Sequence, residues 1–269
     1  MPRIRYLLIT AAILVFTNGA IHAYRSGLLD AEFLAYGQSV VNAGGTSTVR
    51  AGQTASGKLV DDFRRSPYFF RQLDIAKEIV SLNDASVLEN LKDLLGSEDR
   101  HIRGNAAFVL AGLGDVRALD IITEIIRDTS YRAEGQGQGI APGDGKYHVE
   151  SQIRADRYYA VHLLGELKDA RAVPILKPLL KDTEIDYKVA WALGQIGDKS
   201  AIPPLIEALK SRNSEVRVIA IQSLVNLQAT EALPEIRSLL NDSERSHSGT
   251  LASVAETART AIAALERKP

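Results

Sequence analysis

A chain of 269 residues, 45% hydrophobic and 24% charged, has the composition of an ordinary globular protein and is long enough to bury a sizeable core. The formal net charge is −1, so the chain offers no strong basic field for anionic lipid, and we expect no nucleic-acid partner. Cysteine is absent, which excludes disulfides, thiolate metal sites, thiol catalysis and cysteine-linked lipid anchors.

The first 23 residues, MPRIRYLLITAAILVFTNGAIHA, have the pattern of a secretory signal peptide. Arg3 and Arg5 form its positive region, residues 6–16 are apolar, and small residues precede a cleavage position before Tyr24. The alternative is an uncleaved membrane anchor, because the uncharged stretch 6–24 is 19 residues long. Both interpretations predict an extracytoplasmic protein, periplasmic in a bacterium or secreted, and the second adds inner-membrane anchoring.

Residues 24–66 are predicted to form an N-terminal extension, made of a short helix at 28–41 and a linker rich in small residues. Within it, GQTASGKLV (52–60) nearly spells the phosphate-binding loop G-x-x-x-x-G-K-[ST]. Leu59 stands where that loop needs a hydroxyl group to hold magnesium, and the preceding STVRAG is too polar for a core strand. We therefore interpret the segment as part of the linker and expect no nucleotide.

From about residue 71 the chain repeats itself. The residue that starts each turn between helices recurs with spacings of 31, 54, 29 and 31, and the long spacing is one period plus an insertion. Apolar residues seven and eleven positions after each of these markers, and two and five positions before it, predict two amphipathic helices per unit. A period of this size in a helix-forming sequence indicates a solenoid of five stacked helix pairs. The five markers are Asp84, Asp115, Asp169, Asp198 and Ala229.

The stretches AAFVLAGLGDVRALDIITEIIRD (106–128) and AWALGQIGDKSAIPPLIEALK (190–210) resemble the HEAT-like repeats of the phycobilin lyases. The resemblance covers about residues 71–245. It implies an all-α, right-handed α-solenoid over residues 67–269, which Val254–Leu265 closes as a C-terminal capping helix. The family includes scaffolds, adaptors, chaperone-like lyases and a metal hydroxylase, so the resemblance alone does not decide the activity.

Several recurrent polar residues have structural interpretations. The marker aspartates are placed to cap the second helix of each pair. Pro174, Pro203 and Pro234 fall in the first turn of that helix, where a missing N–H is tolerated. Arginines recur twelve residues before the marker, and the resemblance implies an aspartate–arginine ladder between neighbouring units; they are Arg103, Arg157 and Arg217.

The sequence predicts neither a catalytic nor a metal site. The hydroxylase of this repeat family uses paired His-Glu dipeptides, and this chain has none. His148 and Glu150 alternate in KYHVES, but two ligands do not make a metal site. No G-x-S-x-G elbow is present. We expect no resident cofactor and no small-molecule substrate.

The insertion YRAEGQGQGIAPGDGKYHVESQ (131–152) interrupts the repeat once. Its five glycines and its proline predict that it is not helical as a whole. Insertions in solenoids form loops on one face and often bind partners, and the alternative is a surface excursion without a role.

Two sets of side chains are candidates for binding a protein partner. The position seven residues before the marker is predicted to face outward and holds Phe108, His162 and Trp191 in neighbouring units, with Tyr158 and Tyr187 one turn earlier. The chain's own insertion, a partner or a membrane surface could cover such a row. The second helices, which are expected to line the inner groove, present cations at Lys177, Lys181, Lys210 and Arg237.

The sequence therefore favours a non-enzymatic scaffold or adaptor in the cell envelope that holds a protein partner on its curved faces. One alternative is a lyase-like maturation factor that binds a prosthetic group or a client protein. Another is an accessory subunit of a membrane complex, anchored by residues 6–24.

Overall fold

The computed structural model describes residues 54–130, 145–246 and 252–267, with the backbone alone at 145–151. The described part is helical, and an isolated bridge between Arg245 and Ser253 is its only β pairing. The predictions for residues 1–23 and 28–41, and for His148 and Glu150, lie outside these residues or their described side chains.

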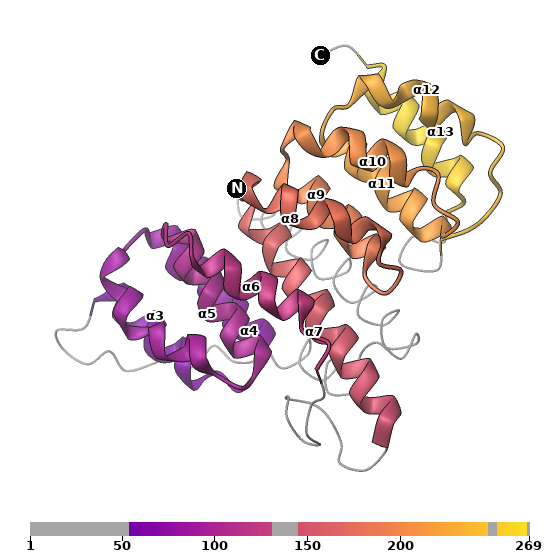
Figure 1. Ribbon diagram of the computed structural model, residues 1–269. Coiled ribbons are helices and arrows are strands. Elements are labelled where there is room, and N and C mark those ends of the chain that lie inside the picture. The colour runs from indigo at the N-terminus through magenta and orange to yellow at the C-terminus, as the bar shows by residue number, and fades with distance from the viewer. Residues whose placement is uncertain (1–53, 131–144, 247–251, 268–269) are drawn as a thin grey trace, which may run out of the picture.

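The helices form two layers along the chain (Figure 1). The first helices of the pairs pack side by side in chain order, so each covers the apolar side of the next. They are α4 (Phe69–Leu82), α5 (Arg100–Gly112), α7 (Gly145–Leu167), α9 (Asp186–Ile196), α11 (Ser214–Asn226) and the terminal α13 (Val254–Leu265).

The second layer is shorter and is built partly of 3-10 turns. Each member packs on its own first helix or on the one that follows it. Its members are η1 (Ala85–Asn90) with η2 (Lys92–Gly96), α6 (Ala118–Arg127), η3 (Ala170–Ala172) with α8 (Val173–Leu176) and η4 (Lys177–Lys181), η5 (Lys199–Ala201) with α10 (Ile202–Ala208), and η6 (Thr230–Ala232) with α12 (Leu233–Ser238). The predicted all-α solenoid of five helix pairs and a capping helix is confirmed.

One backbone device ends the first helix of every pair. The residue just before each marker has a left-handed conformation, with φ between 50° and 100°. This conformation stops the helix and turns the chain toward the second layer. Only two of the five positions carry glycine, the residue that adopts it without steric cost. The five residues are Asn83, Gly114, Lys168, Gly197 and Gln228.

The predicted caps are present. The carboxylate of each marker aspartate accepts a hydrogen bond from the backbone N–H two residues later. The four aspartates are Asp84, Asp115, Asp169 and Asp198. The three prolines stand in the first turn of α8, α10 and α12.

The implied aspartate–arginine ladder is present at Arg157 and Arg217, and a glutamate joins each pair. The guanidinium group of Arg217 donates to the carboxylates of Asp242 and Glu244, each over 2.8 Å. Arg157 likewise pairs with Asp182 and Glu184. These acids lie in the loop before the next first helix, so each arginine joins its helix to the following unit.

The linker interpretation is wrong for residues 55–65, which form α3 (Ala55–Arg65) and pack on α4. Thr54 caps this helix, and Val60 and Phe63 are buried. The repeat layer therefore extends upstream of residue 67. Lys58 lies inside α3, one residue after a backbone N–H that donates to Thr54, so the segment does not have the geometry of a phosphate-binding loop.

The insertion is also shorter than expected, because Gly145–Gln152 form the first turns of α7. The Gly-rich part, 131–144, lies outside the described residues. Among the helices that the structure describes, none has the length and apolarity required to cross a bilayer.

Candidate functional site

A series of ring contacts crosses the layer of first helices from α4 to α9, and a separate pair of rings, Tyr158 and Tyr187, lies beside it, with the amine of Lys188 between Tyr158 and Trp191. We call these rings together the aromatic belt. Neighbouring ring centroids lie between 4.1 and 6.2 Å apart. Its members are Phe69 and Phe70 of α4, His101 of α5, Tyr158, Tyr159 and His162 of α7, and Tyr187 and Trp191 of α9.

The α4 end of the belt is buried and tied by hydrogen bonds. The hydroxyl group of Tyr159 donates to Oδ1 of Asn105 over 2.6 Å, and Nδ2 of Asn105 donates to the carbonyl oxygen of Phe69 over 2.9 Å. Burial raises the pKa of Tyr159 well above its ordinary value, so the phenol stays neutral. This end is therefore a fixed polar core that joins three helices.

His101 lies beside this core and was not singled out by the sequence. Its ring stacks on Phe69 with centroids 4.1 Å apart. Its Nδ1 is 3.6 Å from Oδ1 of Asp99, and its Nε2 is 3.8 Å from Oδ1 of Asp156. This contact could not be predicted from the sequence, because Asp156 lies more than fifty residues further along the chain.

The α9 end of the belt surrounds a lysine amine. Nζ of Lys188 lies 3.5 Å from the centroid of the Trp191 ring and 4.8 Å from that of Tyr158. It also lies 3.0 Å from Nδ1 of His162, whose ring stacks on Trp191 with centroids 5.0 Å apart. When the amine is protonated it can only donate, so Nδ1 of His162 is then the acceptor.

Burial changes the charge state of this group. It lowers the pKa of Lys188 to about 7, against the weaker opposing effect of Glu166. Burial, with the charges of Lys188 and Lys77, lowers the pKa of His162 well below its ordinary value. The histidine is therefore neutral, and the amine is near its titration midpoint at neutral pH.

A glycine makes room for the tryptophan. A Cβ atom on Gly165 would lie 2.7 Å from Cζ3 of Trp191, closer than real contacts allow. The equivalent Gly194 is filled by Ser223 of α11.

The predicted outward row is only partly exposed. His162 and Trp191 are half-buried, but Phe108 is buried, with 3% of its surface exposed. Lys77 of α4 and Glu166 of α7 form an ion pair although α5, which carries Phe108, lies between their helices. The expectation of an exposed Phe108 is therefore wrong.

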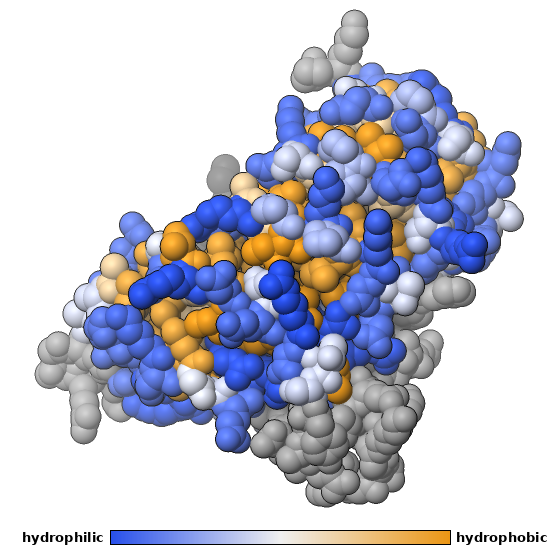
Figure 2. Space-filling view, viewed as in Figure 1, coloured by the Kyte–Doolittle hydropathy of each residue, from blue (hydrophilic) through white to orange (hydrophobic). Residues whose placement is uncertain are grey.

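The cations of the second layer are exposed. Nζ of Lys210 pairs with Oε2 of Glu207 over 2.7 Å, and Arg237 pairs with Glu266. Lys177 and Lys181 also face solvent. Figure 2 shows hydrophobic residues along the middle of the face in view, with hydrophilic residues on both sides. A role for these cations in holding a partner stays a prediction.

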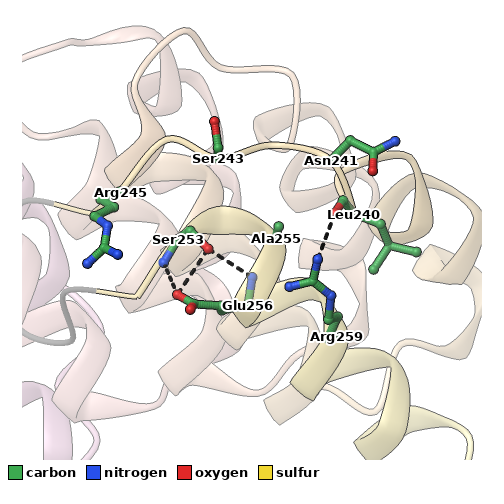
Figure 3. Close-up of a pocket in the computed structure, with 8 residues that line it drawn as sticks. All are labelled: Leu240, Asn241, Ser243, Arg245, Ser253, Ala255, Glu256 and Arg259. Carbon is green, nitrogen blue, oxygen red and sulfur yellow. Dashed lines mark hydrogen bonds between the residues drawn. The ribbon is translucent and has the colours of Figure 1, made fainter.

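A hollow of about 340 Å³ lies at the C-terminal end of the stack (Figure 3). Within it, Ser253 and Glu256 form a capping box for α13, and Nη2 of Arg259 donates to the carbonyl oxygen of Leu240. These hydrogen bonds stabilise the C-terminal end of the solenoid. Across the part of the chain that the structure describes, no three histidine or carboxylate side chains lie close enough together to hold a metal ion.

Comparison with known families gives the same organisation. The family model described as HEAT repeats matches residues 71–135 and 149–213, and the one described as PBS lyase HEAT-like repeat matches 216–242. Together they cover more than half of the chain. The chain belongs to the HEAT-like repeat family.

Curated relatives of this HEAT-repeat protein include the bilin biosynthesis protein PecE of Mastigocladus laminosus. It is 32% identical over 156 residues, which are 56% of this chain and 52% of the relative. The phycocyanobilin lyase subunit alpha of a Picosynechococcus species is 38% identical over 102 residues, 34% of this chain and 38% of the relative. The HEAT-repeat protein thus spans about half, or less, of the length of these relatives.

Two solved structures match the chain with TM-scores below 0.5. The complex of CpcE and CpcF of phycocyanin lyase from Nostoc sp. PCC7120 matches with a TM-score of 0.46 and 24% identity, over 68% of this chain and 66% of that one. Human deoxyhypusine hydroxylase matches with a TM-score of 0.37 and 19% identity, over 93% and 97%.

Proposed function

We propose that this HEAT-repeat protein is a maturation factor of the bilin-lyase type, which binds an open-chain tetrapyrrole and acts with a protein partner. The observation that carries the proposal is the 32–38% identity to curated proteins named for bilin biosynthesis and phycocyanobilin lyase. One of these is named as a subunit, which supports a protein partner.

The α9 end of the aromatic belt supports the small-molecule part of this function. Tyr158, His162, Tyr187 and Trp191 are all half-buried, so each combines a fixed position with an exposed edge. Binding sites for conjugated organic groups usually combine aromatic walls with a few fixed polar groups. Lys188 and His162 supply such groups between the rings.

The absorbance of a bilin and the fluorescence of Trp191 test the proposal together, since Trp191 is the only tryptophan in the sequence. Biliverdin is titrated into the purified full chain, with protohaem as a closed-ring control. We expect a shift of the bilin spectrum and quenching of Trp191 emission, with a Kd on the order of micromolar. A titration without either change, or one in which protohaem binds equally well, would contradict the function.

A second candidate is an extracytoplasmic scaffold or anchored accessory subunit that holds a protein partner and binds no pigment. The N-terminal pattern of Arg3, Arg5 and the apolar stretch 6–16 favours it. Mass spectrometry of the N-terminus, on protein expressed from its complete reading frame, tests the location. A mature chain beginning at Tyr24 supports export, and a retained Met1 on protein recovered from the soluble fraction contradicts it.

A further inference from the structure

One buried nitrogen of an arginine at the edge of the belt lacks a hydrogen-bond acceptor. Nε of Arg154 is buried and has no hydrogen-bond partner. A buried N–H of a charged group without a partner is costly, and native proteins rarely leave one. The arginines of the ladder show the usual arrangement, since Nε of Arg157 donates to the carbonyl oxygen of Ile126 and Nε of Arg217 to Asp242.

Arg154 lies on the same face of α7 as two belt residues. Arg154, Tyr158 and His162 are four residues apart, so they follow one another along the helix. On α9, Tyr187 meets Tyr158 with ring centroids 5.8 Å apart. Burial raises the pKa of Tyr187, and the positive charge of Arg154 acts on it in the opposite direction.

The two tyrosines are donors at neutral pH. Burial raises the pKa of Tyr158 well above its ordinary value, with the phenol of Tyr187 and the carboxylate of Glu215 as smaller causes. Both hydroxyl groups therefore keep their protons, and because the two phenols are hydrogen-bonded to each other, one of the two protons remains to donate to a ligand. The carboxylate of Glu215, on α11, accepts a hydrogen bond from Ser246.

The Trp191 ring is already occupied by its own neighbours. His162 stacks on it, and the amine of Lys188 lies over it. A ligand therefore meets the tyrosines and Arg154 rather than the indole face. A guanidinium one helical turn from Tyr158, whose ring meets that of Tyr187, offers donors for one carboxylate group.

We propose that Arg154, Tyr158 and Tyr187 form a carboxylate-binding site that takes a propionate side chain of the tetrapyrrole. The identity of the ligand rests on the proposed function. The choice of a carboxylate rests on the unpartnered Nε of Arg154. Each propionate is an exposed carboxylate on a flat conjugated molecule, which can lie along the α7–α9 edge beside the tyrosine rings.

The test compares biliverdin with its dimethyl ester, which has the same conjugated system without the carboxylates. Binding is measured by quenching of Trp191 for the unchanged chain, Arg154→Met, Tyr187→Phe and the control Arg212→Met, which removes an exposed arginine. We expect Arg154→Met to weaken biliverdin binding roughly ten- to hundredfold, the usual effect of a hydrogen bond between charged groups. The ester should bind the unchanged chain as weakly as the acid binds Arg154→Met. Far-UV circular dichroism and the emission of unbound Trp191 verify that each variant is folded.

The outcomes separate the site from the function. If biliverdin binds and Arg154→Met binds it as tightly as Arg212→Met does, the carboxylate site is wrong and the proposed function stands. If biliverdin does not bind, 1-pyrenebutyrate and its methyl ester replace it as an aromatic carboxylate pair. Binding of the acid that depends on Arg154 then supports the site and contradicts the bilin function, and no binding contradicts both.

Discussion

Replacing Lys188 by methionine removes a buried amine while keeping most of the side chain's volume. Lys188 is 8% exposed, and its amine has a folded-state pKa of about 7, against 10.5 for an ordinary lysine. The unfolded chain therefore binds more protons than the folded one between these two pH values. Because stability rises with pH wherever the unfolded state binds more protons, the unchanged protein should become more stable from pH 7 upward.

The magnitude follows from the two pKa values. Their separation corresponds to roughly 5 kcal/mol, at about 1.36 kcal/mol per pH unit, and roughly 3 kcal/mol of this falls between about pH 7 and about pH 9.5. Attraction of the ammonium by the Trp191 and Tyr158 rings favours the charged form by ~1 kcal/mol. The net expected gain is about 2 kcal/mol, and Lys188→Met should lack it.

Urea denaturation at about pH 7 and about pH 9.5 measures this difference, followed by circular dichroism. The comparison is the free energy of unfolding of the unchanged protein minus that of Lys188→Met at each pH, since other titrating groups cancel. Lys181→Met, which removes an exposed lysine, is the control. A difference that stays constant between the two pH values would refute the conclusion that burial lowers the pKa of this amine.

Three further substitutions test the packing of the repeats by thermal or urea denaturation. Gly194→Ala places a Cβ atom 2.5 Å from Cβ and 2.8 Å from Cα of Ser223. The resulting overpacking should cost about 3 kcal/mol, which exceeds the gain of about 1 kcal/mol from alanine's higher helix propensity, so the melting temperature should fall. Gln228→Gly relieves a φ of 53° and should stabilise by roughly 0.5–1 kcal/mol; a loss of stability would contradict the left-handed helix end. Arg217→Met leaves Asp242 without its buried partner and should cost about 3 kcal/mol, and a neutral result would show that the ladder does not join the units.

The local features of the repeat could be predicted from the sequence because they depend on neighbours within a few residues. The marker aspartates cap the turn that follows them, and the prolines occupy the first helical turn, as their spacing indicates. The apolar columns likewise predicted which side of each helix is covered. The helix at 55–65 was missed because its small, polar composition resembles a linker, and only the burial of Val60 and Phe63 against α4 shows its role.

The sequence by itself determined the class of fold, since a period of about thirty residues with two amphipathic helices can bury its apolar sides only by stacking neighbouring units. The tertiary structure alone decided which side chains of that stack are accessible. Phe108 occupies the same repeat position as Trp191, yet it is buried, whereas Trp191 is half-buried. The sequence likewise could not predict the unpartnered Nε of Arg154 or the position of the Lys188 amine between the rings. Burial and pairing of these groups depend on residues that are distant along the chain.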